Sequence, residues 1–353
     1  MTNFRINLRN VATVVACLAV MTLFSGCTEK EDECDDCQTC EICATCPTCE
    51  ECDEVCTVTF ISGGEAVNVI RATNGDKLTM PVLKPREDAV FVGWYRDENF
   101  ETAWNFATDA VTANVTLYAK WIVQLLEKVI YENGDYRKFE YDEQNRITNI
   151  SWFNSGEVTP SDSYTLTYSG NDLVKYTYVW NNNSWIQTDD YIRSGNKIIA
   201  TRTYNFNPNV ETLTFDLNSD GTIAKLLHSQ GNTSYEYVYQ YQGGNLSKLI
   251  YTHSYNGVTV YSGTTEYQYD SKHSAFYFSA TPKWRIVQYH SAEYGSKNNV
   301  VETSWEDSGK SVYAYEYDSD GFPTKRTEQY YDAYGNKDDD EWVTEYTYIT
   351  KIQ

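Results

Sequence analysis

Apolar and polar residues alternate with a period of two through most of the chain beyond residue 57. This alternation is typical of strands with one packed face and one wetter face. Short turns containing Asp-Gly, Gly-Asn or Gly-Gly separate the alternating segments, and these residues supply the positive φ that two-residue hairpin loops require. Few residues lie in runs with helical period. The pattern therefore predicts a mainly β protein with little helix.

The segment 122–353 repeats this pattern. Each unit has an aromatic strand, a polar turn and a second strand that opens with an aliphatic residue, as in Phe139–Ile147 and Tyr315–Pro323. The aromatic rings that mark the units stand at positions 141, 168, 191, 215, 241, 269, 294 and 317. Their period of about 25 residues indicates an array with one β-hairpin per unit. We expect an antiparallel hairpin-repeat sheet that is open, coiled or barrel-like.

The segment 57–121 has strands and turns of its own. Gly63-Gly64 and Gly75 mark turns, and Pro81 and Pro85 favour an extended or edge segment. The predicted strands are Val58–Phe60, Val67–Ile70, Phe91–Tyr95 and Val115–Trp121. We expect the large aromatic residues Trp94, Tyr95 and Trp121 to form the core, because a unit of this size needs them for burial. The alternative is that these rings contact a ligand.

The order of these residues resembles the Listeria–Bacteroides repeat, the internalin-type B-repeat of bacterial surface proteins. The resemblance rests on Val58–Phe60, Gly63-Gly64, Gly75-Asp76, Pro81, Pro85, Phe91–Tyr95, Trp104–Phe106 and Val115–Trp121. One departure is Asp88-Ala89, where the family usually has Gly-Tyr. The resemblance implies a small β-grasp module that acts as a spacer or adhesion unit.

The hairpin units of 122–353 resemble YD repeats, the hairpins of Rhs-type bacterial surface and toxin proteins. The shared feature is Tyr-Asp followed by a turn and an aliphatic residue, as at Tyr141-Asp142 and Tyr317-Asp318. Related repeat domains occur in uncharacterised Bacteroidetes lipoproteins. The resemblance implies a long, coiled antiparallel sheet that is open or curls toward a barrel.

Residues 1–26 have the pattern of an export signal. Arg5 and Arg9 precede the apolar run Val11–Phe24, and a Ser-Gly pair comes before Cys27. This run is shorter than the ~20 residues that a spanning helix needs, so we expect a cleaved signal peptide rather than an uncleaved anchor. A small residue before Cys27 resembles the lipobox of bacterial lipoproteins, although Phe24 departs from the commoner Leu. The resemblance implies that Cys27 is acylated, for example with palmitate, and anchors the chain to a membrane.

An acidic run, Thr28–Glu33, follows directly. It resembles the surface-export signal of Bacteroidetes lipoproteins, which implies the outer leaflet of the outer membrane with the protein facing outward. The alternative is a solvated acidic spacer on a lipoprotein that faces the periplasm.

Eight further cysteines occupy the segment 27–56, and the first seven are three residues apart: Cys34, Cys37, Cys40, Cys43, Cys46, Cys49, Cys52 and Cys56. In a 3₁₀ or polyproline-II helix, with three residues per turn, they form one stripe. An even number of thiols in an exported setting predicts disulfides, within the chain or in a disulfide-linked self-association. A metal-thiolate tract is the second interpretation, since Cys-x₂-Cys is zinc spacing, although no histidine lies nearby. An unpaired tether is the third. We expect an acidic stalk.

Charge narrows the range of partners. The chain has 50 acidic and 28 basic side chains, a net charge of −22, and loss of residues 1–26 would remove two arginines and no acid. Nucleic acid and anionic headgroups should repel such a chain, which argues against both as partners. The 31 tyrosines and nine tryptophans agree with a β-rich fold.

Catalytic and metal motifs are missing from the sequence. The four histidines, His228, His253, His273 and His290, are scattered, and no nucleophile elbow, zinc-protease or phosphate-loop motif occurs. Asn218–Gly221 and Asp318–Gly321 resemble the opening of a calcium loop, but Gln329 stands where the second would need Glu, so we expect hairpin turns. We therefore expect no enzyme and no cofactor, and the ligand-binding residues stay unknown.

These observations define three hypotheses. The first is a cell-surface lipoprotein acting as a non-enzymatic structural, adhesion or binding module, with a glycan or a host or cell-surface protein as partner. The alternative is a glycan-binding lipoprotein of a polysaccharide-uptake system, in which Tyr and Trp stack on sugar faces. The third is a hydrolase, which needs two carboxylates about 5–10 Å apart in a cleft. Exposed aromatic rings would favour binding, and buried rings a scaffold.

Overall fold

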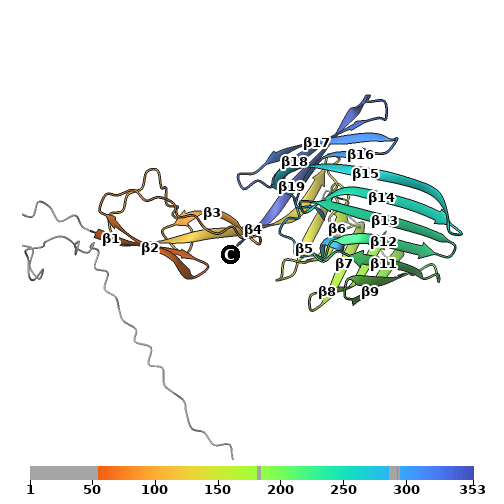
Figure 1. Cartoon of the computed structure of the whole chain (residues 1–353), viewed down its shortest axis with the longest axis horizontal. Coiled ribbons are helices and arrows are strands. Elements are labelled where there is room, and N and C mark those ends of the chain that lie inside the picture. The colour runs from red at the N-terminus through yellow and green to blue at the C-terminus, as the bar shows by residue number, and fades with distance from the viewer. Residues whose placement is uncertain (1–54, 181–183, 286–291, 293–294) are drawn as a thin grey trace, which may run out of the picture. The chain divides into compact units, whose positions relative to one another are not determined.

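The computed structural model describes residues 55–180, 184–285, 292 and 295–353 (Figure 1). Contacts divide the chain into two compact units, one formed by 55–84 with 93–120 and the other by 85–92 with 121–353. Nearly all regular structure in these ranges is strand, which confirms the predicted mainly-β class. Within the same ranges no helix is long and apolar enough to cross a membrane.

The first unit is a small sheet. Strand β1 (Val55–Ser62) pairs antiparallel with β2 (Glu65–Thr73) and parallel with the first residues of β4 (Val115–Tyr131), and β3 (Val90–Tyr95) supplies the aromatic strand. Its core is aromatic, as expected. The rings of Phe60 and Trp94 meet edge to face with centroids 4.9 Å apart, and both side chains are buried.

The other two aromatic residues expected in the core differ. Trp121, which belongs to the second unit, is buried and lies beside Phe91, with ring centroids 5.3 Å apart. Tyr95 is only half-buried, and its ring packs against that of Phe100 at 5.7 Å. Burial of both tryptophans agrees with the core role that the size of the unit requires.

The second unit is a closed antiparallel barrel of sixteen strands. Beyond β4 the strands are β5 (Tyr136–Tyr141), β6 (Ile147–Phe153), β7 (Asp162–Ser169), β8 (Asp172–Trp180), β9 (Trp185–Ser194), β10 (Lys197–Tyr204), β11 (Glu211–Leu217), β12 (Ile223–Gln230), β13 (Thr233–Gln242), β14 (Asn245–Tyr255), β15 (Val258–His273), β16 (Asn298–Trp305), β17 (Gly309–Tyr317), β18 (Pro323–Tyr331) and β19 (Lys337–Ile352). Each strand pairs with the next, and β19 returns to β4, where Ile352 faces Ile122. The expected hairpin array is therefore closed.

The outward face of the barrel is charged. Lysines and acids stand directly opposite one another on neighbouring strands and form ion pairs, as Lys175 with Asp190 and Lys248 with Glu266 do. Lys197 with Asp216 and Lys325 with Glu316 repeat the arrangement elsewhere on the wall. Because side chains alternate along a strand, the intervening residues point inward, and these are mainly aliphatic and aromatic.

Residues 274–285, which follow β15, lie at one end of the barrel. Phe276 packs against Phe139 of β5 with ring centroids 5.2 Å apart, and Trp284 packs against both Tyr191 of β9 and Phe215 of β11. These partners lie on strands far apart around the wall, so residues 274–285 lie inside the ring. We call 274–285 the interior segment.

One predicted ring position lies outside the described residues. Seven of the eight predicted ring positions lie on strands, but position 294 lies between β15 and β16 and outside the described residues. The eighth strand of the series is β19, where Tyr348 takes the corresponding place.

Candidate functional site at the mouth of the barrel

The repeated tyrosines tie neighbouring hairpins together. The hydroxyl of Tyr168 on β7 donates to the carbonyl oxygen of Ile147 on β6 at 2.9 Å, and the pairing of β7 with β8 shifts register at the same residue. Tyr141, Tyr269, Tyr315 and Tyr348 make the same bond to the preceding strand. Burial raises the pKa of Tyr168 to about 12. These rings build the wall and are not available to a ligand.

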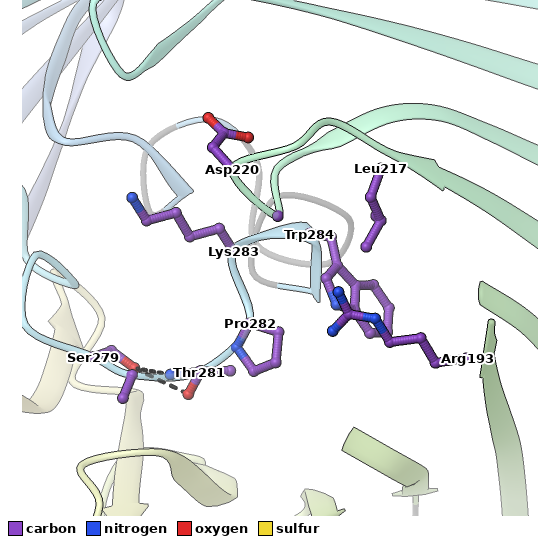
Figure 2. A pocket seen from close by; sticks show the side chains of 10 residues that line it. Arg193, Leu217, Asp220, Ser279, Thr281, Pro282, Lys283 and Trp284 are labelled. Atoms are coloured by element: carbon purple, nitrogen blue, oxygen red, sulfur yellow. Dashed lines mark hydrogen bonds between the residues drawn. The ribbon is translucent and has the colours of Figure 1, made fainter. Parts of the chain in front are cut away.

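A cavity of about 310 Å³ lies beside the interior segment (Figure 2). Figure 2 shows Arg193, Asp220 and Lys283 around it, with Trp284 on one side. The Asp220 carboxylate accepts hydrogen bonds from the hydroxyl and the backbone N–H of Thr222, and these bonds lower its pKa. The chain next to Trp284 continues into residues outside the described ranges, so we assign no site here.

The inner wall also holds a fully buried carboxylate, Asp189 on β9. Arg202 of β10 donates to both of its oxygens, at 2.7 and 2.9 Å, while Gln187 and Tyr191 donate to one oxygen each at 3.2 Å. Four donated hydrogen bonds compensate for the loss of water around the charge. Asp189 and Arg202 stand directly opposite each other in the hairpin of β9 and β10, and sequence analysis did not single out this pair.

A second buried acid, Glu211 on β11, stands opposite Arg202 in the register of β10 and β11. Its carboxylate accepts hydrogen bonds from Tyr204 at 3.0 Å and Gln230 at 2.9 Å, and it lies 2.9 Å from His228 Nε2. Like Asp189, it is enclosed by side chains of the wall. The two acids therefore have the contacts of structural residues, and neither presents an open oxygen to a cleft.

The opposite end of the barrel, which we call the mouth, is bordered by the turns 132–135, 154–161, 306–308 and 332–336. A cavity of about 570 Å³ lies here, with Tyr131, Trp152 and Trp342 among its walls. The rings of Tyr131 and Trp152 stack with centroids 5.1 Å apart and an interplanar angle of 27°. The Arg137 guanidinium lies 4.7 Å from the Trp152 centroid. We call this the Trp152 cavity.

Charged side chains of fixed position complete the Trp152 cavity. Arg326 lies against the ring of Tyr313, donates to the Thr344 hydroxyl at 3.4 Å and pairs with Glu328 at 3.5 Å. Glu328 also accepts a hydrogen bond from the Ser311 hydroxyl at 2.8 Å. A guanidinium and a carboxylate thus lie in the same wall as the aromatic rings, which gives the cavity both hydrogen-bond donors and acceptors.

A second cavity, of about 380 Å³, lies at the mouth between β14, β15 and β16. Tyr251, Tyr261 and Trp305 supply its aromatic walls. Gly263 gives the Tyr261 ring its room, because a Cβ at that position would lie 2.6 Å from the tyrosine hydroxyl. We call this the Trp305 cavity.

The mouth aromatics differ from the tyrosines of the wall in exposure. Tyr261 is 55 % exposed, Trp342 43 % and Trp305 36 %, whereas the wall tyrosine Tyr141 is partly buried. Sequence reasoning did not single out these rings. The one available signal was that Trp152, Trp305 and Trp342 stand near the turns that lack the repeated Tyr-Asp pattern.

The cysteines predicted as lipid, disulfide or metal sites fall mostly outside the described residues. This applies to Cys27, Cys34, Cys37, Cys40, Cys43, Cys46, Cys49 and Cys52. Cys56 is described and lies buried on β1. Among the described residues no group of three or more His, Cys, Asp or Glu side chains could hold a metal ion.

Comparison with known proteins agrees with the sequence analysis of the first unit. Residues 57–120 match the Listeria-Bacteroides repeat domain, as predicted. The chain is also similar to two proteins of Evansella cellulosilytica. One, named "Putative membrane protein", is 35% identical over 127 residues, which are 35% of this chain and 18% of that protein. The other, named "Putative Gly-rich membrane protein", is 40% identical over 87 residues, 24% of this chain and 10% of that protein. The chain thus spans less than a fifth of either relative.

Solved structures with some likeness to this chain include two from Bacteroides. A porin-like protein from Bacteroides uniformis is 14% identical, with a TM-score of 0.43, and the match covers 65% of this chain and 96% of that one. A porin-like protein from Bacteroides vulgatus is 14% identical, with a TM-score of 0.29, and the match covers 64% and 99%.

Proposed function

We propose that this chain is a non-enzymatic, lipid-anchored protein of the cell surface whose barrel binds a glycan at its mouth. The observation that carries the proposal is the Trp152 cavity, where exposed and half-exposed rings lie beside fixed charged groups. Tyr261, Trp305 and Trp342 of the mouth are exposed, which is the condition set for a binding module, while Tyr131 and Trp152 are partly buried. The aromatic side chains of the wall instead take part in packing and hydrogen bonds within the barrel.

The chemistry of the Trp152 cavity suits a sugar. Flat rings such as Tyr131 and Trp342 offer a large apolar surface to the C–H face of a pyranose at little entropic cost. Sugar hydroxyls are both donors and acceptors, and Arg326 with Glu328 supplies the complementary groups in a single wall. Glycan binding of this kind requires no chemical reaction.

Three observations support the proposed location at the cell surface. The lipobox-like sequence ends at Cys27, the first unit matches a repeat domain, and the relatives in Evansella are named as membrane proteins. The outward face of the barrel carries ion pairs such as Lys175 with Asp190, whereas strands that face lipid carry an apolar band. A lipid on Cys27 would supply the attachment that this face does not.

Binding is tested with the mature chain, purified in detergent and applied to a glycan array. We expect retention of at least one glycan class, and loss of that signal in Trp152→Ala and Trp342→Ala. The matched control is Tyr136→Ala, which removes a ring stacked on Phe153 on the outward face of the same wall. Absence of binding to every glycan would refute the proposed ligand class.

The anchor has its own test. Cys27→Ser should abolish incorporation of labelled palmitate and release the chain from the membrane fraction, while a Cys17→Ser control should do neither. Protease added to intact cells should cleave the wild-type chain if it faces outward. A Cys27→Ser protein that stays in the membrane fraction would contradict the lipid anchor.

A further inference from the structure

The two cavities of the mouth lie on one continuous arc of the wall. The strands run in the order β15, β16, β17, β18, β19, β4, β5 and β6, each hydrogen-bonded to the next. Tyr261 stands on the first of these strands and Trp152 on the last. With neighbouring strands ~4.8 Å apart, seven steps separate the two rings by about 34 Å along the wall.

The wall between the cavities is also aromatic. Tyr330 on β18 lies 6.4 Å from Trp305, ring centroid to ring centroid, and its hydroxyl donates to the carbonyl oxygen of Ser308 at 2.6 Å. On the next strand Trp342 stands directly opposite Glu328. The rings of Tyr261, Trp305, Tyr330, Trp342, Tyr131 and Trp152 therefore follow one another around this side of the mouth. We call them the aromatic arc.

The rings on the other side of the mouth are arranged differently. Tyr164 and Tyr178 stack face to face with centroids 4.5 Å apart and an angle of 9°, and Trp185 stacks on Phe206 at 5.9 Å. Rings in such pairs cover one of each other's faces. The aromatic arc also contains one such pair, Tyr131 on Trp152. Tyr261, Trp305 and Trp342, however, line the two cavities and are 55 %, 36 % and 43 % exposed, so their faces are better placed to meet a ligand.

The charges along the arc restrict the ligand further. The two cavities are lined by four acids, Glu132, Asp135, Glu328 and Glu306, and by one base, Arg326. A polymer of sugar acids would meet net negative charge on this wall and on a chain of net charge −22. A neutral polysaccharide would avoid this repulsion and would still find carboxylate acceptors for its hydroxyls.

We propose that one extended, neutral polysaccharide chain binds along the aromatic arc and occupies both cavities at once. This inference rests on the proposed glycan-binding function and names the form of the ligand. A chain that fills both cavities makes its second contact at a high effective concentration, so its affinity exceeds that of either cavity alone by about 10²–10⁴-fold. Sugars too short to reach both cavities bind each cavity separately.

Titration calorimetry tests the inference with the mature chain in detergent. The probes are ladders of cello-, xylo- and manno-oligosaccharides, from the disaccharide to the octasaccharide, with a polygalacturonate ladder as the acidic counterpart. For the neutral class that binds, we expect two disaccharides per barrel with weak affinity. Above the length that spans the arc, we expect one chain per barrel and a rise of at least 100-fold in affinity.

Two single substitutions separate the cavities. Trp342→Ala removes a ring of the Trp152 cavity, and Trp305→Ala removes a ring of the Trp305 cavity. Each should lower the disaccharide stoichiometry from two to one and return the octasaccharide to the affinity of the disaccharide. Tyr136→Ala should change neither. Near-UV circular dichroism shows whether each variant keeps the native packing, and Trp→Phe at the same positions gives milder variants.

The outcomes distinguish this inference from the function on which it rests. Equal affinities for short and long chains, or two octasaccharides per barrel, would overturn the arc and leave glycan binding intact. Tighter binding of polygalacturonate than of every neutral ladder would overturn the neutral class. No binding of any ladder, together with a silent array, would overturn both proposals.

Discussion

The hydroxyl of Tyr141 donates a hydrogen bond to the carbonyl oxygen of Leu126 at 2.8 Å, across the boundary between β5 and β4. The pairing of β5 with β6 shifts register between Glu140 and Tyr141, where β6 carries one extra residue, Thr148. The same bond recurs along the barrel. The repeated tyrosine of this sequence is therefore a link between consecutive hairpins.

Removing that hydroxyl should weaken the barrel. Tyr141→Phe leaves the ring in place and deprives the buried Leu126 carbonyl of its partner, so we expect a loss of about 1 kcal/mol in the free energy of unfolding. Urea denaturation followed by tryptophan fluorescence measures it. Tyr136→Phe is the control, because Tyr136 lies on the outward face. Equal stability of the two variants would show that the link contributes nothing.

Alkaline solution should destabilise the barrel through the same class of residue. Burial raises the pKa of Tyr168 to about 12 from its ordinary value of 10.0. Because the folded state raises this pKa, the contribution is complete below pH 10 and is lost as the pH rises toward 12. Thermal midpoints measured from pH 8 to 11.5 should fall, and less steeply in Tyr168→Phe. Identical slopes in the two proteins would contradict this assignment.

Acid should act through His273. Burial lowers the pKa of this imidazole from 6.5, with Lys297 and Lys272 adding to the shift and Asp318 and Asp270 opposing it. Its ring lies 5.0 Å from that of Phe322.

Because the folded state lowers this pKa, the stabilisation by neutral His273 is present above pH 6.5 and is lost as the pH falls. His273→Phe keeps an aromatic ring at this position and should reduce the loss of stability between pH 7 and 5. Thermal midpoints across that range provide the measurement. A variant as acid-sensitive as the wild type would place the sensitivity elsewhere.

The pair of Asp189 and Arg202 should be sensitive to the loss of one partner. Asp189→Ala leaves the Arg202 guanidinium partly buried and without its carboxylate, and such changes cost about 3–5 kcal/mol. The matched control is Glu266→Ala, which breaks the outward pair with Lys248 and should cost at most about 1 kcal/mol. Replacement of both Asp189 and Arg202 by Leu should recover much of the loss. Denaturant midpoints of the four proteins decide the comparison.

Local sequence patterns predicted much of the fold. Alternation and turn residues gave the hairpins of 122–353, and the aromatic strand Phe91–Tyr95 gave the core of the first unit through Trp94. Closure of the barrel had no local signal, because it depends on pairing between residues 122–131 and 344–352. Any hairpin array offers the same alternation whether its ends meet or not.

The cluster of aromatic side chains at the mouth could not be predicted from the sequence either. Trp152, Trp305 and Trp342 look like ordinary strand aromatics, and only the arrangement of the strands places them at one end, with Trp305 and Trp342 exposed.

The barrel can close only when its last strand, β19, pairs with β4. Until that strand arrives, β4 and β18 each present an unpaired edge, and such edges invite association with other chains. Pairing across more than two hundred residues also slows folding. The ring of this barrel therefore closes only after the last strand of the chain has been made.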